Sequence, residues 1–211
     1  ADELVFYDIG ASTYDGVVSK EWVKAIAEKI NIPFCVAGGI KSVEQAKVIL
    51  NSGADKVSVN SPAIERPELI HELANEFGSQ CVVVGIDSLM IEDDYIVYSK
   101  TGDESTATNT SIKTIDWIEK VQDLGAGEIV LNCMDRDGVR DGYDIYQLNK
   151  MISISNIPVI ASGGAGSMKD FKNVLTQTNS SGALAASVFH KNLFNINDLK
   201  IYLKKESLNI R

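Results

Sequence analysis

Several aspartates stand at the ends of apolar runs, where a carboxylate could transfer protons. Asp8 ends "LVFYD", Asp87 ends "VVVGID", and Asp135 and Asp137 follow "IVLNCM". An aspartate in such a place can act as a general acid or base, or it can simply cap the turn or helix that follows. Asp87 is the strongest candidate for proton transfer, because it ends the most apolar run and burying a carboxylate costs free energy.

Two pairs of glycines also follow apolar runs. Gly38 and Gly39 come after "FCVA", and Gly163 and Gly164 come after "VIAS". Glycine leaves backbone N–H groups open to a phosphate, especially where a helix begins next. A single pair could equally be a turn with positive φ. The recurrence of "IPFCVAGG" as "IPVIASGG" favours a phosphate-binding role for both pairs.

A further apolar run follows each glycine pair and ends in small polar residues. Asn60 and Ser61 follow the first of these runs, and Ser187 ends "ALAAS" in the second. If the runs are neighbouring strands of a barrel, each glycine pair and its polar partners form a phosphate cradle at the mouth. Two cradles on opposite sides of the mouth predict a small-molecule substrate with a phosphate at each end.

Strands and helices alternate along the chain, which indicates an α/β fold built from βαβ units. Nearly continuous apolar runs are typical of parallel strands that are covered on both faces. Residues 1–65 and 126–190 repeat the same block, so we predict a TIM (β/α)8 barrel with half-barrel duplication, forming a single domain over residues 1–211. The predicted strands are residues 3–9, 33–39, 55–60, 81–87, 128–133, 158–164 and 182–189.

The symmetry of the two halves leaves the first half short of one βα unit. The strand at 81–87 and the helix at 112–125 open the second half, and nothing in the sequence precedes the first half in the same way. We therefore expect seven barrel strands, with strand 1 and helix 1 of the eightfold barrel missing. Closure of an intact barrel in some other way is the alternative.

Composition argues against several classes of partner. The net charge of −9 is spread along the chain, which disfavours a nucleic-acid surface. Because no apolar run reaches the length of about 18 residues that a membrane span needs, we expect no membrane partner and a cytoplasmic location. Cys35, Cys81 and Cys133 lie in apolar runs without metal-ligand spacing, so we predict buried free thiols, no metal and no other cofactor.

The segment 90–111 is too long and polar for an ordinary connection between a strand and a helix. It should form a small hairpin, with "YIVY" as one strand, that folds over the mouth. A mobile lid and mere surface decoration are both consistent with this pattern.

The ordered series of motifs resembles the cyclase subunits of imidazole glycerol phosphate synthase, in a form similar to that of gamma-proteobacteria. The resemblance runs from Asp2 to Arg211 and rests on "DELVFYDI", "IPFCVAGGIKS", "GADKVSVNSPA", "FGSQCVVVGID", "GAGEIVLN", "DRDGVRDGYD", "IPVIASGGAG" and "ALAASVFHK". It implies a half-duplicated (β/α)8 barrel and a lyase of histidine biosynthesis. With ammonia, the family converts a bisphosphorylated ribulosyl aminoimidazole carboxamide nucleotide to imidazole glycerol phosphate and aminoimidazole carboxamide ribotide.

The resemblance also assigns roles to individual residues. Asp87 matches one of the family's two catalytic aspartates, and the other would lie upstream of Ala1, so the resemblance implies that this chain is impaired. Asp8 matches a substrate contact, and Gly10 stands where the family usually has threonine. One phosphate site is matched by Gly39, Asn60 and Ser61, and the other by Asp137, Gly138, Gly164, Ala186 and Ser187.

Charged residues at the starts of the strands match the opposite face of the family's barrel. Glu3, Lys56 and Glu128 match a charged ring at an ammonia entrance, and Asp55 matches a position that faces a partner. The partner that the resemblance implies is a glutaminase subunit in a heterodimer. Without the resemblance, these side chains would be interpreted as ordinary solvated charges.

Two other functions share features with this sequence. A phosphosugar isomerase of the same pathway has the duplicated barrel and both cradles, so the fold alone does not exclude it. A non-catalytic fragment that only docks a glutaminase is the second alternative. Asp87, "DRDG" and "ASVFH" favour the cyclase over the isomerase.

Overall fold

The structure is a computed structural model that describes residues 1–8 and 16–211, so Gly10 lies outside the described residues. The strands are β1 (Leu4–Tyr7), β2 (Phe34–Ala37), β3 (Lys56–Val59), β4 (Val82–Ile91), β5 (Asp94–Ser99), β6 (Thr108–Lys113), β7 (Glu128–Cys133), β8 (Val159–Ser162) and β9 (Gly182–Ala183). The helices are α1 (Lys20–Ala27), α2 (Val43–Asn51), α3 (Ser61–Glu65), α4 (Glu68–Phe77), α5 (Thr114–Asp123), α6 (Ile145–Ile152), α7 (Met168–Gln177), α8 (Ser187–His190) and α9 (Ile196–Lys205), with a 3-10 turn η1 (Ser79–Cys81).

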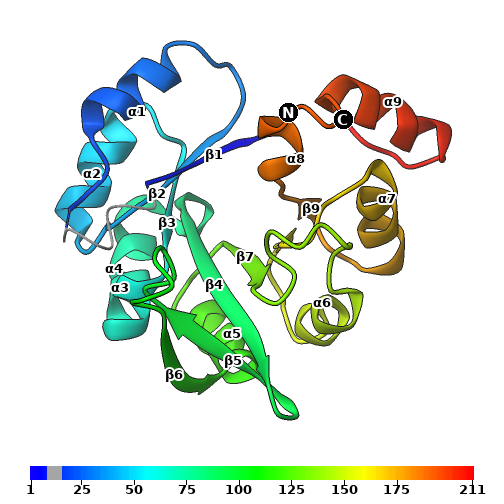
Figure 1. Cartoon of the computed structure of the whole chain (residues 1–211). Coiled ribbons are helices and arrows are strands. Elements are labelled where there is room, and N and C mark those ends of the chain that lie inside the picture. Colours follow the sequence, from blue (N-terminus) through cyan, green and yellow to red (C-terminus); the bar gives the residue numbers. More distant parts are fainter. Residues whose placement is uncertain (9–15) are drawn as a thin grey trace.

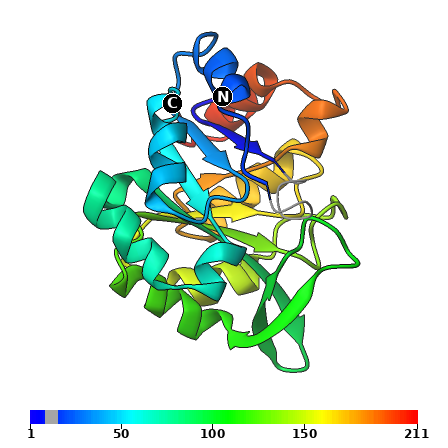
Figure 2. The same cartoon turned by 90° about the vertical axis from the view of Figure 1, so that its left-hand side faces the viewer.

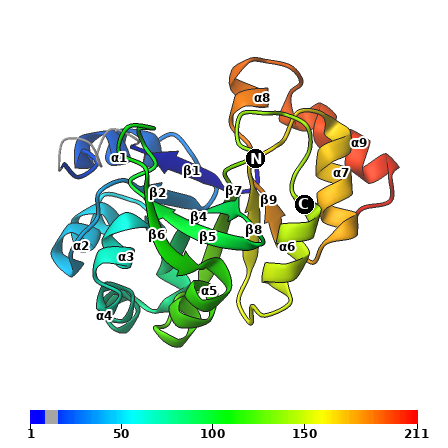
Figure 3. The same ribbon diagram turned by 60° about the horizontal axis from the view of Figure 1, so that its bottom comes forward.

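Seven of these strands run parallel, in the order β1-β2-β3-β4-β7-β8-β9. The helices lie around the outside of the curved sheet (Figure 1, Figure 3). This arrangement confirms the predicted α/β barrel class and the expected seven parallel barrel strands in the described part of the chain. Because the strands are parallel, their carboxyl ends share one edge, where such barrels carry their sites.

The apolar runs form the strands because both faces of the sheet are covered. All four residues of β2 are buried, and Val82, Val83 and Val84 of β4 are fully buried. The larger apolar core lies between the sheet and the helices, and a separate small cluster centres on Cys35, Val83 and Val130. Since neighbouring residues of a strand face opposite sides, this small cluster fills the inner side of the barrel.

The predicted hairpin is present and larger than expected. β4 continues beyond Asp87 to Ile91 and pairs antiparallel with β5, which in turn pairs antiparallel with β6. The three strands extend away from the parallel sheet (Figure 2). The prediction of the hairpin is therefore confirmed, although β6 covers the first two residues of the helix that the sequence placed at 112–125.

Two predictions are wrong in detail. The last strand ends at Ala183 instead of continuing to residue 189, because Ser187–His190 form the short helix α8. Cys81 is only partly buried, since it ends the 3-10 turn η1 before β4 begins, whereas Cys35 and Cys133 are buried as expected. All three thiols are free.

The last helix packs close to the first strand. Lys200 of α9 donates a hydrogen bond to Asp2 over 2.7 Å, and Leu208 and Ile210 pack against the main core. The two ends of the chain lie near each other in all three views (Figures 1 to 3). Within the part of the chain that the structure describes, no helix is long and apolar enough to span a membrane.

Candidate active site at the carboxyl ends of the strands

Asp87 lies at the mouth and accepts hydrogen bonds from three side chains. Asn132 Nδ2 donates to Asp87 Oδ1 over 2.8 Å, and Asn60 Nδ2 donates to Oδ2 over 2.7 Å. Thr101 Oγ1 donates to the same Oδ2 over 2.5 Å. The carboxylate is partly buried and reaches the mouth, as the sequence predicted. A carboxylate held by amide and hydroxyl donors keeps a fixed orientation, which proton transfer requires.

The course of β4 places Asp87 there. β4 pairs with β3 only as far as Val84, and from Asp87 onward it pairs with β5 on that side. Asp87 lies opposite Asn132 in the parallel pairing with β7. The next residue, Ser88, faces the helices and is fully buried, with its hydroxyl 2.7 Å from Thr114 Oγ1. Gln147 also donates to this hydroxyl, so the strand is fixed immediately behind the carboxylate.

Asn132 and Thr101 are functional candidates that the sequence analysis missed. Asn132 is a polar residue inside the apolar run "EIVLNC", which was a usable signal, because a buried amide needs a partner. Its Oδ1 accepts a hydrogen bond from Ser162 Oγ over 3.3 Å. Thr101 follows β5 in the hairpin, and nothing in its local sequence distinguishes it from the other polar residues of that turn.

Asn60 belongs to both the carboxylate site and the first predicted cradle. Its Nδ2 binds Asp87, whereas its Oδ1 is buried and has no hydrogen-bond partner among the described residues. A buried acceptor without a partner costs free energy, and a donor on a bound ligand would relieve that cost.

The first glycine pair follows β2 and lies against Asp8. A Cβ on Gly38 would come within 2.7 Å of Asp8 Cβ, and Gly38 and Gly39 both have positive φ, 143° and 65°. Only glycine adopts such a backbone freely. Asn60 and Ser61 follow the adjacent strand β3, at the start of α3. The structure thus places all the predicted residues of this cradle at the same edge of the sheet.

The second glycine pair follows β8 and repeats this arrangement. A Cβ on Gly163 would come within 2.6 Å of the Cys133 carbonyl, and one on Gly164 within 2.2 Å of the Gly142 carbonyl. Gly142 N–H also donates to the Gly164 carbonyl over 2.9 Å. Ala186 and Ser187 begin α8, just as Asn60 and Ser61 begin α3. They lie beyond the end of β9, on the side where the other strands also end.

Not every amide of the second loop is open to a phosphate. The Asp170 carboxylate accepts hydrogen bonds from the N–H groups of Gly166 and Ser167, over 3.0 and 2.7 Å. With Ser167 it forms a capping box at the start of α7. The N–H groups of Gly166 and Ser167 are therefore not available to a phosphate, and Gly163 and Gly164 remain the candidates of this loop.

The loop after β7 carries the remaining predicted residues. Asp135, Asp137 and Gly138 are exposed at the carboxyl edge of the sheet. Asp137 N–H donates to the Cys133 carbonyl over 3.0 Å, and Gly138 has a φ of 75° with open space around it. The side-chain hydrogen bonds that hold Asp87 do not include Asp135 or Asp137, so the structure does not bring these carboxylates together.

Three charged residues meet at the opposite, amino-terminal ends of the strands. Lys56 Nζ lies 2.9 Å from Glu3 Oε1 and 2.9 Å from Glu128 Oε2. Burial lowers the pKa of Lys56, but its hydrogen bonds to Glu3 and Glu128 outweigh this effect and leave the pKa above its ordinary value. All three side chains are at most about one-third exposed. They are a partly buried cluster with a net charge of −1, and not three solvated charges.

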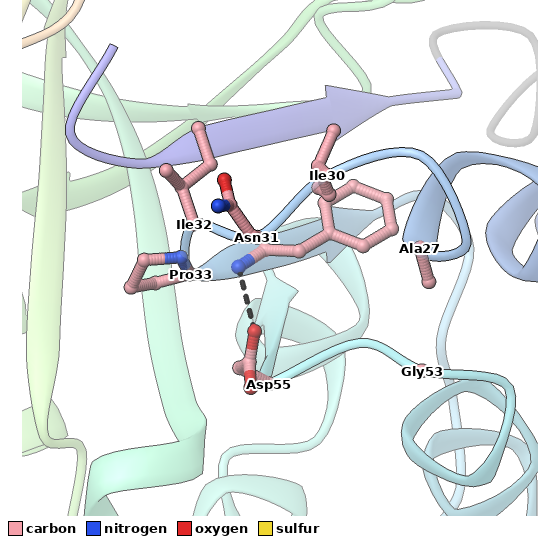
Figure 4. A pocket seen from close by; sticks show the side chains of 8 residues that line it. Ala27, Ile30, Asn31, Ile32, Pro33, Gly53 and Asp55 are labelled. Carbon is pink, nitrogen blue, oxygen red and sulfur yellow. Dashed lines mark hydrogen bonds between the residues drawn. The ribbon is translucent and has the colours of Figure 1, made fainter.

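Asp55 lies on the same face beside a cavity of about 430 Å³. Its Oδ2 accepts a hydrogen bond from the Phe34 N–H over 2.8 Å, which ties the start of β2 to the connection before β3 (Figure 4). The rest of the lining consists of Ala27, Ile30, Asn31, Ile32, Pro33 and Gly53. Because this cavity lies at the amino-terminal ends of the strands, it is at the opposite edge of the sheet from Asp87. The structural role of Asp55 there is to hold the start of β2.

The described residues contain no group of three or more His, Cys, Asp or Glu side chains that could hold a metal ion. The polar groups gathered at Asp87 are its own carboxylate, two side-chain amides and one hydroxyl.

Comparison with known proteins adds an independent finding. A family model described as "Histidine biosynthesis protein" matches residues 1–195. The chain is 60% identical over 213 aligned residues to the imidazole glycerol phosphate synthase subunit HisF of Pseudoalteromonas translucida (strain TAC 125), an alignment that covers 100% of this chain and 83% of the relative. The subunits HisF of Vibrio cholerae (strain O395) and Vibrio campbellii are 58% and 57% identical with the same coverage.

Proposed function

Because the chain belongs to the family of imidazole glycerol phosphate synthase subunit HisF, we propose that it binds a bisphosphorylated ribulosyl aminoimidazole carboxamide nucleotide and takes part in its cyclisation with ammonia. The products would be imidazole glycerol phosphate and aminoimidazole carboxamide ribotide. The observation that carries the proposal is the position of Asp87, between Asn60 and Asn132 at an edge where both glycine pairs lie.

The two phosphates are assigned to the two sides of the mouth. One binds at Gly38, Gly39, Asn60 and Ser61, and the other at Gly163, Gly164, Ala186 and Ser187, with Asp137 and Gly138 alongside. Backbone N–H groups at positive-φ glycines and a hydroxyl at the start of the next short helix are suitable donors for an anion. Asp8, against Gly38, would contact the part of the substrate between them.

Asp87 would exchange protons with the substrate between the phosphates. Its carboxylate takes a proton as the ammonia nitrogen adds to the ketone carbon of the substrate, and the ketone oxygen leaves as water. The carboxyl group then returns a proton to the ribotide nitrogen as the carbon–nitrogen bond to the ribotide breaks and the imidazole ring closes. The side chains of Asn60 and Asn132 hold it in orientation during both transfers. Among these 211 residues Asp87 alone matches the family's pair of catalytic aspartates, so we expect turnover by these residues alone to be low, since one positioned proton-transfer group contributes about 10²–10⁴ in rate.

The amino-terminal face is the proposed place of ammonia entry and of a glutaminase partner. The Glu3, Lys56 and Glu128 cluster lies at the starts of three strands, on the axis side of the barrel, and Asp55 is exposed beside it. Delivery from that face would keep ammonia away from solvent until it reaches Asp87. A cytoplasmic location follows from this proposed role.

Substrate binding tests the proposal without depending on turnover. In calorimetric titrations we expect one bisphosphorylated substrate per chain, and Ser61→Ala and Ser187→Ala should each weaken binding by about tenfold, the value of one hydrogen bond to a charged group. Ser153→Ala, an exposed serine at the end of α6, is the matched control and should bind like the unmodified chain. A monophosphate that binds as tightly as the bisphosphate would contradict the proposal.

A further inference from the structure

The turn between β5 and β6 contacts two parts of the proposed site through adjacent residues. Lys100 N–H donates a hydrogen bond to Ser61 Oγ over 2.8 Å, and Thr101 Oγ1 donates to Asp87 Oδ2. Figure 1 shows this turn bent back toward α3, which begins at Ser61. Two adjacent residues therefore connect the first phosphate cradle with the carboxylate of Asp87.

Thr101 fills the second acceptor position on Oδ2 of Asp87. Oδ2 accepts from both Thr101 and Asn60, while Oδ1 accepts from Asn132. A carboxylate oxygen has about two lone-pair sites, so Oδ2 is fully engaged. A proton from a substrate can reach Oδ2 only after one of these donors withdraws, and the donor on the turn is freer to move than Asn60 at the end of a barrel strand.

Ser61 can respond to a phosphate while it holds Lys100. A hydroxyl that accepts a hydrogen bond from an N–H group still has its own hydrogen to donate. If the Ser61 side chain rotates about its Cα–Cβ bond to bring this hydrogen to a phosphate, Oγ moves away from Lys100 N–H and that contact weakens. Lys100 has a φ of 56°, a left-handed conformation that is unfavourable for a residue with a side chain, so the turn gains free energy by relaxing once the contact is lost.

We propose that the turn Lys100–Thr106 couples the two groups: phosphate binding at Asn60 and Ser61 withdraws Thr101 from Asp87. Oδ2 of Asp87 is then open to the substrate only when the cradle is occupied. This inference rests on the proposed phosphate site at Ser61. The Thr106 hydroxyl donates to the Lys100 carbonyl over 2.7 Å, so the turn moves as one unit.

The coupling has a reciprocal consequence. If phosphate binding weakens the contact between Thr101 and Asp87, then removing that contact must strengthen phosphate binding by the same factor. Thr101→Val should therefore bind phosphate about fivefold more tightly or more, which is the lower range for coupled sites. Thr176→Val makes the same change at an exposed position of α7, where the hydroxyl donates to the Lys172 carbonyl of the same helix, and should leave the affinity unchanged.

A titration with inorganic phosphate, followed by NMR, tests the proposal. The amide resonances of Asn60 and Ser61 report binding, and the carboxyl carbon of Asp87 reports the loss of the Thr101 hydrogen bond. In the unmodified chain we expect the amide resonances and the Asp87 carboxyl resonance to shift together. In Thr101→Val we expect only the amide resonances to shift. Lys100→Gly keeps the N–H group but adopts positive φ without strain, so it should weaken the coupling.

The outcomes separate the two proposals. If phosphate shifts the amides of Asn60 and Ser61 but the Asp87 carboxyl responds equally in Thr101→Val, the coupling is wrong although the phosphate site stands. Unchanged phosphate affinity in Thr101→Val, or undiminished coupling in Lys100→Gly, would also overturn it. If these amides do not shift at all in any variant, the phosphate site itself is wrong and the coupling falls with it.

Discussion

Asn132 Nδ2 donates to Asp87 Oδ1 across the parallel pairing of β7 with β4. Asn132→Asp would replace this donor with a second carboxylate, and two carboxylates in contact cannot both be ionised without a large cost. One of the two carboxyl groups would therefore have a pKa above its value in the unfolded chain. The variant would keep its stability below about pH 4, where that group is protonated in both states, and would lose stability as the pH rises.

We expect Asn132→Asp to lower the free energy of unfolding by roughly 1–3 kcal/mol at pH 7, with a smaller loss at pH 4.5. Urea unfolding at the two pH values measures this difference. Asn132→Ala removes the hydrogen bond without adding charge, so its loss should vary little with pH. An equal loss for Asn132→Asp at both pH values would contradict the described contact.

Gly164 and Gly138 allow the cost of positive φ to be compared with the cost of a steric clash. Both have positive φ, but a Cβ on Gly164 would lie 2.2 Å from the Gly142 carbonyl, whereas Gly138 has open space. Gly138→Ala should cost about 1–2 kcal/mol from backbone strain alone. Gly164→Ala adds the clash and should cost about 2–5 kcal/mol. Chemical unfolding of both variants provides the comparison, and equal losses would mean that the two loops do not pack as described.

The sequence predicted the parallel strands and both glycine pairs because these features depend on local pattern. It did not predict Thr101 beside Asp87, since that contact depends on the path of a hairpin of about 20 residues and not on neighbouring sequence. The capping of Gly166 and Ser167 by Asp170 was predictable, because a serine three residues before an aspartate signals a capping box.

The last strand was predicted to be too long. "ALAASVFH" is apolar enough to suggest a strand through residue 189, but Ser187–His190 turn into α8. Short apolar runs do not distinguish strands from helices by pattern alone. Ser187 still lies at the carboxyl edge of the sheet, as predicted. The error therefore concerns the secondary structure of this segment and not the position of Ser187.

Lys56 should give the stability a dependence on alkaline pH. Its pKa is raised by its contacts with Glu3 and Glu128, so its contribution is fully present below the unfolded value of about 10.4 and is lost as the pH rises through the higher folded value. Unfolding followed from pH 7 to 11.5 should show a larger loss of stability in the unmodified chain than in Lys56→Met, because the buried Cys35 and Cys133 thiols contribute to the loss in both.

At pH 7, Lys56→Met leaves two partly buried carboxylates together and should cost about 2 kcal/mol. Lys24→Met is the matched control, because Lys24 and Glu28 form an exposed pair at 3.9 Å. It should change the stability little. If the alkaline loss of stability were as large in Lys56→Met as in the unmodified chain, the three-residue cluster would not contribute to it.

The three cysteines should differ in reactivity. Burial raises the pKa of the Cys35 and Cys133 thiols, whereas Cys81 is partly exposed. A thiol-reactive dye should label Cys81 in the folded chain, and label Cys35 and Cys133 only at the rate of unfolding. Cys81→Ser should abolish the fast phase. Because raised thiol pKa values favour the protonated folded state, stability should also begin to fall above about pH 8.5.

The central claim is that one substrate spans the mouth, with a phosphate in each cradle and Asp87 between them. An NMR titration with the bisphosphorylated substrate tests it directly, through the amides of Gly39 and Ser61 on one side and of Gly164 and Ser187 on the other. We expect the resonances of these four amides and of the Asp87 carboxyl carbon to reach saturation together, at one substrate per chain. Saturation of the two sides at different concentrations, or a response on one side alone, would contradict it.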